Sequence, residues 1–343
     1  MNNSTCLQPS PASTVGLPII YSCLFPAGSL GNSLTAWIFS RRAPTRRPQS
    51  IYLANLVAAN LLLCSTMPFL AAYFAGGHRW PHGSAQCRLA QHVGTLVMHV
   101  SMYVTIVILS STALSQYATL KKGTGTQRSQ ALPGSFQRRL LQKFRRPEFA
   151  KYLCVVIWLS VLGITVTAIA YDSQARAAAG LPVCYNIRVE VGDRPAMIAA
   201  SLATACFFLS FTTVLWSYYS LTRHLSKIQK NSCIGEKHLI YSTVKRNILV
   251  IQMILTVCFL PYHIFRPIFY ILLTDNDCPR LNHLVEIKNF LTCLAAAKSS
   301  LDPVIILLLD KTFKKSLYGL FTKSSPEHQN HNNDIFNDMG RNM

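Results

Sequence analysis

Residues 257–273, "VCFLPYHIFRPIFYILL", are apolar or aromatic at thirteen of seventeen positions. They belong to the apolar run 247–273, and about 20 apolar residues are enough for a helix to cross a bilayer. Yet His263 and Arg266 lie in the middle of the stretch. A cation in such a segment is costly unless it faces other helices or a water-filled cavity. The stretch therefore predicts a membrane-spanning helix with one polar face turned inward.

The rest of the chain has a similar composition. Of its 343 residues, 50% are hydrophobic and only 13% are charged, whereas about 25% are charged in an ordinary soluble domain. Seven apolar runs are long enough to span a bilayer: 17–39, 51–74, 89–114, 152–171, 196–221, 247–273 and 290–309. The predicted fold class is an all-α membrane protein with a seven-transmembrane helix bundle at residues 17–309.

Lysine and arginine gather in alternate connectors. The connector 40–50 holds four of them, 119–151 holds nine and 222–246 holds six. Because such residues mark the cytoplasmic side, we expect the N-terminal segment 1–16 outside the cell and the C-terminus inside. The lysines and arginines behind the net charge of +20 then form a basic collar on the cytoplasmic side, where they face anionic membrane lipid. We therefore expect no nucleic acid as a partner.

The sequence also predicts features of both ends of the chain: glycosylation at the N-terminus, and a membrane-surface helix followed by a disordered tail at the C-terminus. Overlapping glycosylation sequons begin at Asn2 and Asn3. In residues 310–322, Phe313, Leu317 and Leu320 share one helical face and Lys311, Lys314 and Lys315 supply charge, which predicts a short amphipathic helix on the inner leaflet. The polar segment 323–343 predicts a disordered cytoplasmic tail.

The predicted topology places each cysteine that lies outside the apolar runs on one side of the membrane. Cys6, Cys87, Cys184 and Cys278 fall outside the cell, where disulfides persist, and four cysteines allow three pairings. Cys233 falls inside, where we expect it to stay reduced.

Polar and aromatic residues of the run 247–273 share one helical face, because they are spaced by four, three and four: Phe259, His263, Arg266 and Tyr270. Pro261 lacks a backbone donor and would kink this helix. A kinked, cation-bearing face near the outer end suits an anionic ligand. The alternative is that Arg266 only extends to the outer lipid headgroups.

The run 290–309 contains two opposite charges. Lys298 and Asp302 are four residues apart and can pair on one face. Lys288, at the outer end of the same helix, would add a second cation to an anionic-ligand pocket formed around Arg266.

Enzyme motifs are absent from the sequence. It has no phosphate-binding glycine loop, no H-E-x-x-H and no G-x-S-x-G. We therefore expect no enzyme activity, no cofactor and no metal.

An ordered set of motifs resembles the rhodopsin-family (class A) G-protein-coupled receptors. The matching positions are Gly31-Asn32, "LANLVAAN" at 53–60, Trp80 before Cys87, Trp158, "CFLPYH" at 258–263, Asp302-Pro303 and Phe313. Within that family, "CFLPYH" followed by Arg266 resembles the purinergic nucleotide-receptor branch.

The resemblance implies roles for particular residues. It implies a Cys87–Cys184 disulfide and, as usual in the purinergic branch, a Cys6–Cys278 disulfide. The implied ligand-binding residues are His263, Arg266, Lys288, Tyr262 and Tyr270. The positions implied in switching and G-protein coupling are Gln116, Tyr117, Phe259, Pro261, Asp302 and Pro303.

Several positions depart from the family pattern, among them Phe259, which replaces the common tryptophan. Gln116 stands where the family has the arginine that engages the G protein, and Ile306 stands where it has a tyrosine. Asn60 replaces the aspartate that helps to bind sodium. We expect the ammonium of Lys298, paired with Asp302, to occupy that space.

The expected function is that of a plasma-membrane receptor that senses an extracellular ligand, unnamed by the sequence, and signals to heterotrimeric G proteins. One alternative is a poorly coupling receptor, a decoy or a partner subunit of the same fold, which Gln116 and Ile306 favour. A small transporter is a more remote alternative, because we find no internal repeat between the first and last three spans.

Overall fold

The computed structural model describes residues 8–41, 47–78, 80, 85–123, 136–178, 194–229, 235–272 and 278–309. Every regular element within these ranges is a helix. Several predictions fall on residues outside them: the glycosylation sites Asn2 and Asn3, the cysteines Cys6, Cys184 and Cys233, Phe313, and the segments 310–322 and 323–343.

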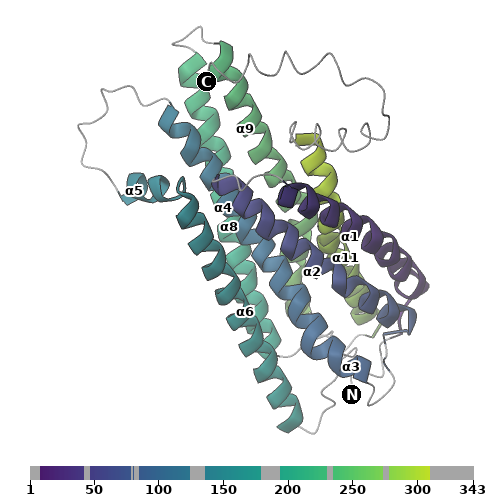
Figure 1. Cartoon of the computed structure of the whole chain (residues 1–343). Helices are drawn as coiled ribbons and strands as arrows, with labels where there is room; N and C mark the ends of the chain where they lie inside the picture. The colour runs from purple at the N-terminus through teal and green to yellow at the C-terminus, as the bar shows by residue number, and fades with distance from the viewer. Residues whose placement is uncertain are drawn as a thin grey trace, which may run out of the picture. The chain divides into compact units, whose positions relative to one another are not determined.

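The long helices are α1 (Leu17–Arg41), α2 (Pro48–Ala75), α4 (Thr95–Gly123), α6 (Pro147–Ala178), α8 (Arg194–Gln229), α9 (Gly235–Ile254), α10 (Leu260–Leu272) and α11 (Cys278–Leu309) (Figure 1). Two further helices are short: α3 (Ala85–Leu89) and α5 (Phe136–Lys143). Three π-helical turns extend longer helices: η2 (Ala12–Gly16), η3 (Ala90–Gly94) and η5 (Leu255–Phe259).

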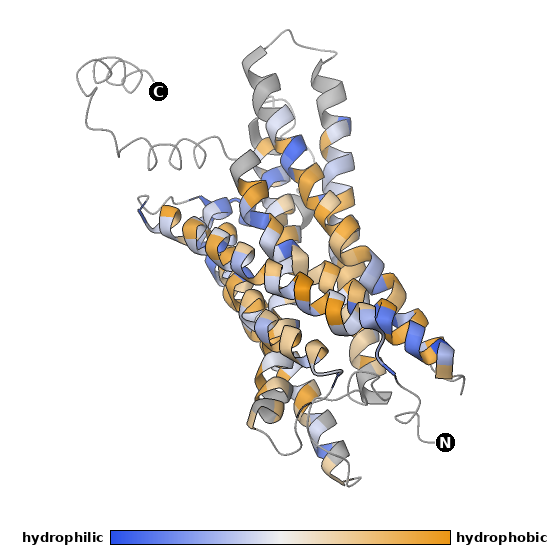
Figure 2. Cartoon of the chain, turned by 90° about the vertical axis from the view of Figure 1, so that its right-hand side faces the viewer, coloured by the Kyte–Doolittle hydropathy of each residue, from blue (hydrophilic) through white to orange (hydrophobic). Residues whose placement is uncertain are grey.

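Each predicted apolar run overlaps these helices, and several helices extend beyond the runs: α4 continues to Gly123, α8 to Gln229, and α11 begins at Cys278. By length and composition, six described stretches could cross a membrane: Ala12–Arg41, Pro48–Ala75, Thr95–Leu120, Pro147–Tyr171, Met197–Arg223 and Ser242–Leu272. The seventh predicted run, 290–309, lies within α11 and carries Lys298 and Asp302. Figure 2 shows apolar residues along most of the length of the helices.

Helix α4 is the packing centre of the described residues up to Pro303, which form one compact unit; a second unit begins at Val304. α4 contacts α2, α6, α8 and α9, and most of it is buried. α6 exposes a row of large apolar side chains instead. Exposed apolar surface of this extent is expected where lipid is the solvent.

Close packing joins α1 and α11 within the first unit. A Cβ atom added at Gly31 would lie 2.7 Å from Cγ of Pro303. Only a residue without a side chain allows that approach. A buried cluster contributed by α1, α2 and α11 continues the contact, and its members include Leu17, Tyr21, Cys64, Met67, Cys293 and Ala296.

The effect of Pro261 is visible in the helix before it. Because proline has no backbone N–H, the carbonyl four residues earlier loses its usual partner. The π-helical turn η5 lies immediately before Leu260, and α10 continues beyond it. The sequence predicted a kink at Pro261, and π-helical turns are one of the common causes of kinks in long helices.

Candidate functional site

Arg266 lies on the face of α10 that packs against the bundle. Its Nη1 donates a hydrogen bond of 2.7 Å to the hydroxyl of Tyr103 on α4. The guanidinium carbon lies 5.6 Å from the ring centroid of Tyr262, and the phenol of Tyr270 is within electrostatic range. The side chain therefore points toward other helices rather than outward to headgroups.

His263 is completely buried beside this arginine. Its Nδ1 lies 2.9 Å from the carbonyl oxygen of Phe259, so Nδ1 is the donor. The imidazole stacks on Phe207 of α8 with ring centroids 4.1 Å apart, and it meets Tyr103 edge to face at 6.0 Å. His263 thus builds the aromatic wall that holds Tyr103, and through it Arg266.

Lys288 of α11 brings a second cation to the same region. Its Nζ lies 4.9 Å from the ring centroid of Phe269 on α10. The charges of both Lys288 and Arg266 act on His99 of α4, whose Nδ1 is bonded to the Thr95 carbonyl at 2.8 Å. We call the group Arg266, Lys288, Tyr103, Tyr262 and Tyr270 the cation–tyrosine cluster.

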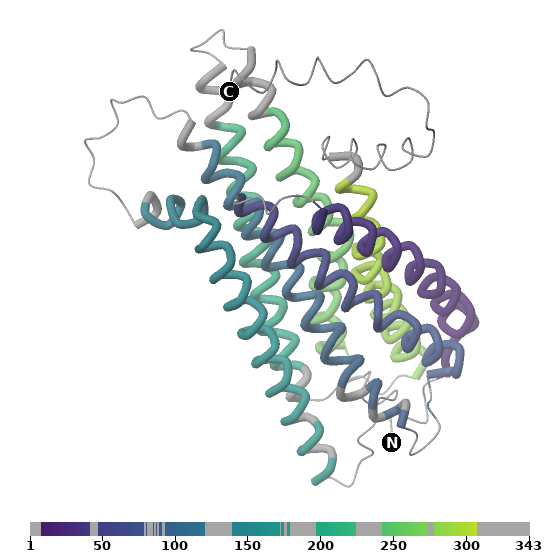
Figure 3. Tube along the Cα trace, viewed as in Figure 1, coloured from purple at the N-terminus to yellow at the C-terminus, as the bar shows by residue number. Residues whose placement is uncertain are grey.

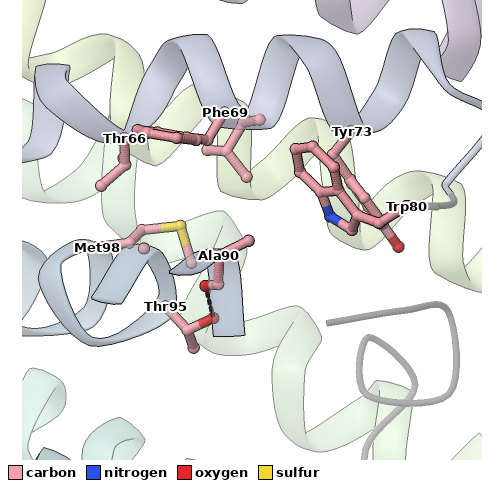
Figure 4. Close-up of a pocket in the computed structure, with 9 residues that line it drawn as sticks. Thr66, Phe69, Tyr73, Trp80, Ala90, Thr95 and Met98 are labelled. Carbon is pink, nitrogen blue, oxygen red and sulfur yellow. Dashed lines mark hydrogen bonds between the residues drawn. The ribbon is translucent and has the colours of Figure 1, made fainter. Parts of the chain in front are cut away.

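A small cavity lies elsewhere, between α2 and the segment from η3 to α4 (Figure 4). Its volume is about 30 Å³, far below the 300–1,000 Å³ typical of small-molecule sites. The lining residues are Thr66, Phe69, Leu70, Tyr73, Trp80, Ala90, Gly94, Thr95 and Met98. None of the predicted ligand-binding residues is among them, so this cavity and the predicted site are separate.

A buried ionic centre lies deeper in the bundle. Lys298 forms an ion pair with Asp302, and their side chains are only 1% and 3% exposed. This confirms the pairing predicted from their spacing. Asn60 of α2 completes the arrangement, because its Oδ1 accepts a bond from Lys298 Nζ at 3.2 Å and its Nδ2 donates to Asp302 Oδ2 at 2.7 Å.

The same network reaches α1. Asn60 Nδ2 also lies 3.0 Å from Oδ1 of Asn32. The amide nitrogen of Asn32 donates to the carbonyls of Ser299 and Gly28, both at 2.8 Å. Asn32, Asn60, Lys298 and Asp302 therefore tie α1, α2 and α11 together. The family resemblance predicted that Lys298 and Asp302 lie beside Asn60, and the bonds confirm it; the partners of Asn32 were not predicted.

The predicted coupling residues lie near the end of α4. Gln116 is 7% exposed, and within the described part of the chain its Oε1 has no hydrogen-bond partner. Tyr117 packs edge to face against Trp216 of α8 at 5.3 Å. Ser115 Oγ donates to the carbonyl of Phe144 at 3.0 Å and fixes the connector that leads into α6.

The remaining predicted switch residues lie in α10 and α11 and in the π-helical turn before α10. Phe259 is fully buried at the end of η5, and Pro261 is half-buried in the first turn of α10. Pro303 follows Asp302 and packs on Gly31.

Two of the predicted extracellular cysteines are described, and both are disulfide-bonded: Cys87 in α3 and Cys278 at the start of α11. Their pairing stays a prediction, since Cys6 and Cys184 lie outside the described residues.

Residues close to Cys6 contact the first turns of α11. The amide of Gln8 donates to Asn282 Oδ1 at 3.0 Å. Ser10 Oγ bonds to a carboxylate oxygen of Glu286.

Comparison with known proteins identifies the class. Residues 31–126 and 137–306 match the 7 transmembrane receptor (rhodopsin family), and the chain belongs to this family. It is a receptor and not an enzyme, and the predicted seven-transmembrane fold is confirmed. The family couples extracellular ligands to G proteins.

Particular relatives are receptors as well. The chain is 50% identical over 329 residues to Probable G-protein coupled receptor 82 of Homo sapiens, covering 95% of this chain and 98% of that protein. It is 26% identical over 320 residues to Probable G-protein coupled receptor 34 of Pan troglodytes, covering 93% and 79%. It is 25% identical over 337 residues to a purinoceptor of Rattus norvegicus, covering 94% and 87%. The predicted resemblance to the purinergic branch is confirmed.

Proposed function

We propose that this protein is a plasma-membrane receptor, with its N-terminus outside the cell, that binds an anionic extracellular ligand at the cation–tyrosine cluster and signals to a heterotrimeric G protein. The environment of Arg266 carries this proposal. Among the residues that the structure describes, its partners are phenols and no carboxylate pairs with it. A cation inside a helical bundle is costly without a counter-charge, and an anionic ligand would supply one.

The members of the cluster, and His263 beside it, have different roles. The guanidinium of Arg266 offers a planar fork that suits a carboxylate or phosphate, whereas Lys288 supplies a point charge. Tyr103 holds the guanidinium when no ligand is bound. His263 is fully buried, so it acts as a positioning residue that keeps Tyr103 in place.

Ligand binding would be transmitted through α10. This helix follows η5 and packs against α8, so a ligand held by Arg266 pulls on the segment containing Phe259 and Pro261. Such switching requires that the ligand bind one arrangement of the bundle more tightly than the other.

A cell-based G-protein reporter tests the site against acidic metabolites, nucleotides and acidic lipids. Loss of charge-assisted hydrogen bonds of about 1.5–3 kcal/mol predicts that Arg266→Gln raises the half-maximal concentration of the active compound by about 10- to 100-fold. The matched control is Arg280→Gln, an exposed arginine on α11. With equal surface expression, an undiminished response in the Arg266 variant removes this residue from the site.

Gln116 supports a second candidate, a poorly coupling receptor of the same fold. It is neutral and buried where the family has a charged arginine. Gln116→Arg should then raise reporter output above that of the parent chain, while Gln116→Met, of similar size and without charge, should not. Equal output from all three proteins would show that the missing charge does not limit coupling.

For the outer disulfides we propose the pairs Cys6–Cys278 and Cys87–Cys184. The bond from Gln8 to Asn282 supports the first pair, because it holds the chain near Cys6 against the start of α11. Mass spectrometry of non-reduced peptides tests both pairs, and a Cys6–Cys184 peptide would contradict them. The same digestion, with and without glycosidase, tests glycans at Asn2 and Asn3.

A further inference from the structure

α5 is a short helix that lies across the direction of α6 (Figure 3). It has one apolar and one basic face. Leu141 and, just after the helix, Phe144 are buried against the bundle, while Arg139 and Lys143 are exposed. The bond from Ser115 to the Phe144 carbonyl fixes the end of the helix to α4. The apolar face is therefore used for packing, and the basic face remains available.

The turn from α5 into α6 is held by backbone hydrogen bonds. The amide of Arg146 donates to the Lys143 carbonyl at 2.9 Å, and the amide of Ala150 donates to the Arg146 carbonyl at 3.2 Å. Phe144 also meets Phe149 edge to face at 5.1 Å. The exposed cations Lys143 and Arg146 are therefore attached to a backbone that hydrogen bonds hold in place.

The cations adjoin a lipid-facing surface. Directly after Lys151, α6 exposes Tyr152, Val155 and Leu159, at 67%, 56% and 65%. Their spacing of three and four places them on one helical face. In a membrane this face contacts acyl chains, so the basic residues that precede it lie at the level of the headgroups.

The charge at this corner is not compensated locally. Residues 139–151 contain five lysines and arginines and one acidic residue, Glu148. Among the described residues, Glu148 forms no ion pair with any of them. We propose that the α5–α6 corner, made of Arg139, Lys143, Arg145, Arg146 and Lys151, binds the headgroup of a polyanionic inositol phospholipid in the inner leaflet.

A lipid fits this surface better than a soluble anion. Arginine forks bind phosphate groups in a bidentate manner, and the exposed face of α6 offers a path for the acyl chains of the same molecule. The proposal goes beyond ligand sensing at the cation–tyrosine cluster and shares with it only the orientation of the chain.

Native mass spectrometry of the purified full-length receptor tests the site with phosphatidylinositol bisphosphate and with phosphatidylcholine. The test variant combines Arg139→Gln, Lys143→Gln and Arg146→Gln. The matched control removes three exposed cations elsewhere: Arg41→Gln, Arg223→Gln and Arg246→Gln. Each basic residue in contact with the bound headgroup contributes about fivefold in affinity, so the test variant should bind the inositol lipid on the order of 100-fold more weakly. The control cations lie outside the corner and would not contact that headgroup, so the control should bind less than about threefold more weakly.

Three results would overturn the proposal. Equal weakening by test and control variants would mean that only overall charge matters. If soluble inositol trisphosphate displaces the bound lipid as strongly as added inositol lipid does, the corner binds a free polyanion and not a membrane lipid. Lipid binding that survives the triple substitution while activation of a purified G protein is lost would make the corner a protein contact. The single reversal Arg139→Glu, at an exposed position, provides a second variant with the same expected direction.

Discussion

Replacing Lys298 with methionine is expected to destabilise the bundle strongly. The ammonium and the Asp302 carboxylate are both almost fully buried, so removing one charge leaves the other uncompensated. Breaking a buried ion pair in this way costs about 3–5 kcal/mol. Asn60 still donates a bond of 2.7 Å to Asp302, which keeps the expected loss near the lower limit, about 3 kcal/mol. Methionine nearly fills the space of the lysine stem, so little of the loss comes from a cavity.

Thermal unfolding of the detergent-purified receptor, followed by tryptophan fluorescence at one fixed scan rate, measures this loss. A change of 1 kcal/mol shifts the melting temperature of a large domain by about 2–4 °C, so we expect a drop of about 6–12 °C. The control is Lys245→Met, a half-buried lysine whose Nζ lies 5.9 Å from the ring of Tyr218. Loss of this cation–π contact costs about 0.5–1 kcal/mol.

A double substitution separates the ion pair from other effects. Lys298→Met combined with Asp302→Asn removes both charges and leaves polar groups that Asn60 can bond. The double variant should recover most of the stability lost by Lys298→Met, which gives a coupling energy of at least about 1 kcal/mol in the cycle. If Lys298→Met melts within the range of the Lys245→Met control, or if the two substitutions are additive, the stabilising role assigned to the buried pair is refuted.

Three further expectations use the same melting assay. Because the buried carboxylate is already neutralised by an internal ammonium, exchanging choline for sodium should leave the melting temperature unchanged; a sodium-specific rise would contradict this. Gly31→Ala should destabilise by about 1–3 kcal/mol, since the new Cβ would lie 2.7 Å from the ring of Pro303, whereas Gly163→Ala, whose Cβ meets nothing within 4 Å, should be neutral or slightly stabilising. Trp158→Phe should cost about 1 kcal/mol, because it removes the 3.0 Å bond from the indole to Asn55; an unchanged melting point would mean that this bond is not formed.

Local features of the sequence predict much of the fold. A run of some 20 apolar residues is a strong signal because a bilayer imposes a minimum helix length. Spacing along one helix is equally direct: Lys298 and Asp302 are four residues apart, and that separation alone predicts their ion pair. Pro261 likewise predicts an irregular helix, although its position does not determine that the irregularity is a π-helical turn.

Contacts between helices could not be predicted in this way. The partner of Arg266 is Tyr103, 163 residues away in the chain. The contact of Lys298 with Asn60, 238 residues apart, was expected only from the family resemblance and not from spacing along one helix. Such contacts depend on how helices rotate and pack, which periodicity does not determine. His263 illustrates the difference, since its helical face was predicted, whereas its stacking on Phe207 depends on the position of α8.

The ion pair on α11 also bears on the electrical response of the receptor. Membrane potential does work on any charge that moves through the bilayer, about 2.3 kcal/mol per elementary charge for each 100 mV. Lys298 and Asp302 are four residues apart on one helix and carry opposite charges, so a shift of α11 displaces both together and transfers no net charge. Depolarisation of the cell therefore performs no net work on this ion pair when α11 shifts along the membrane normal.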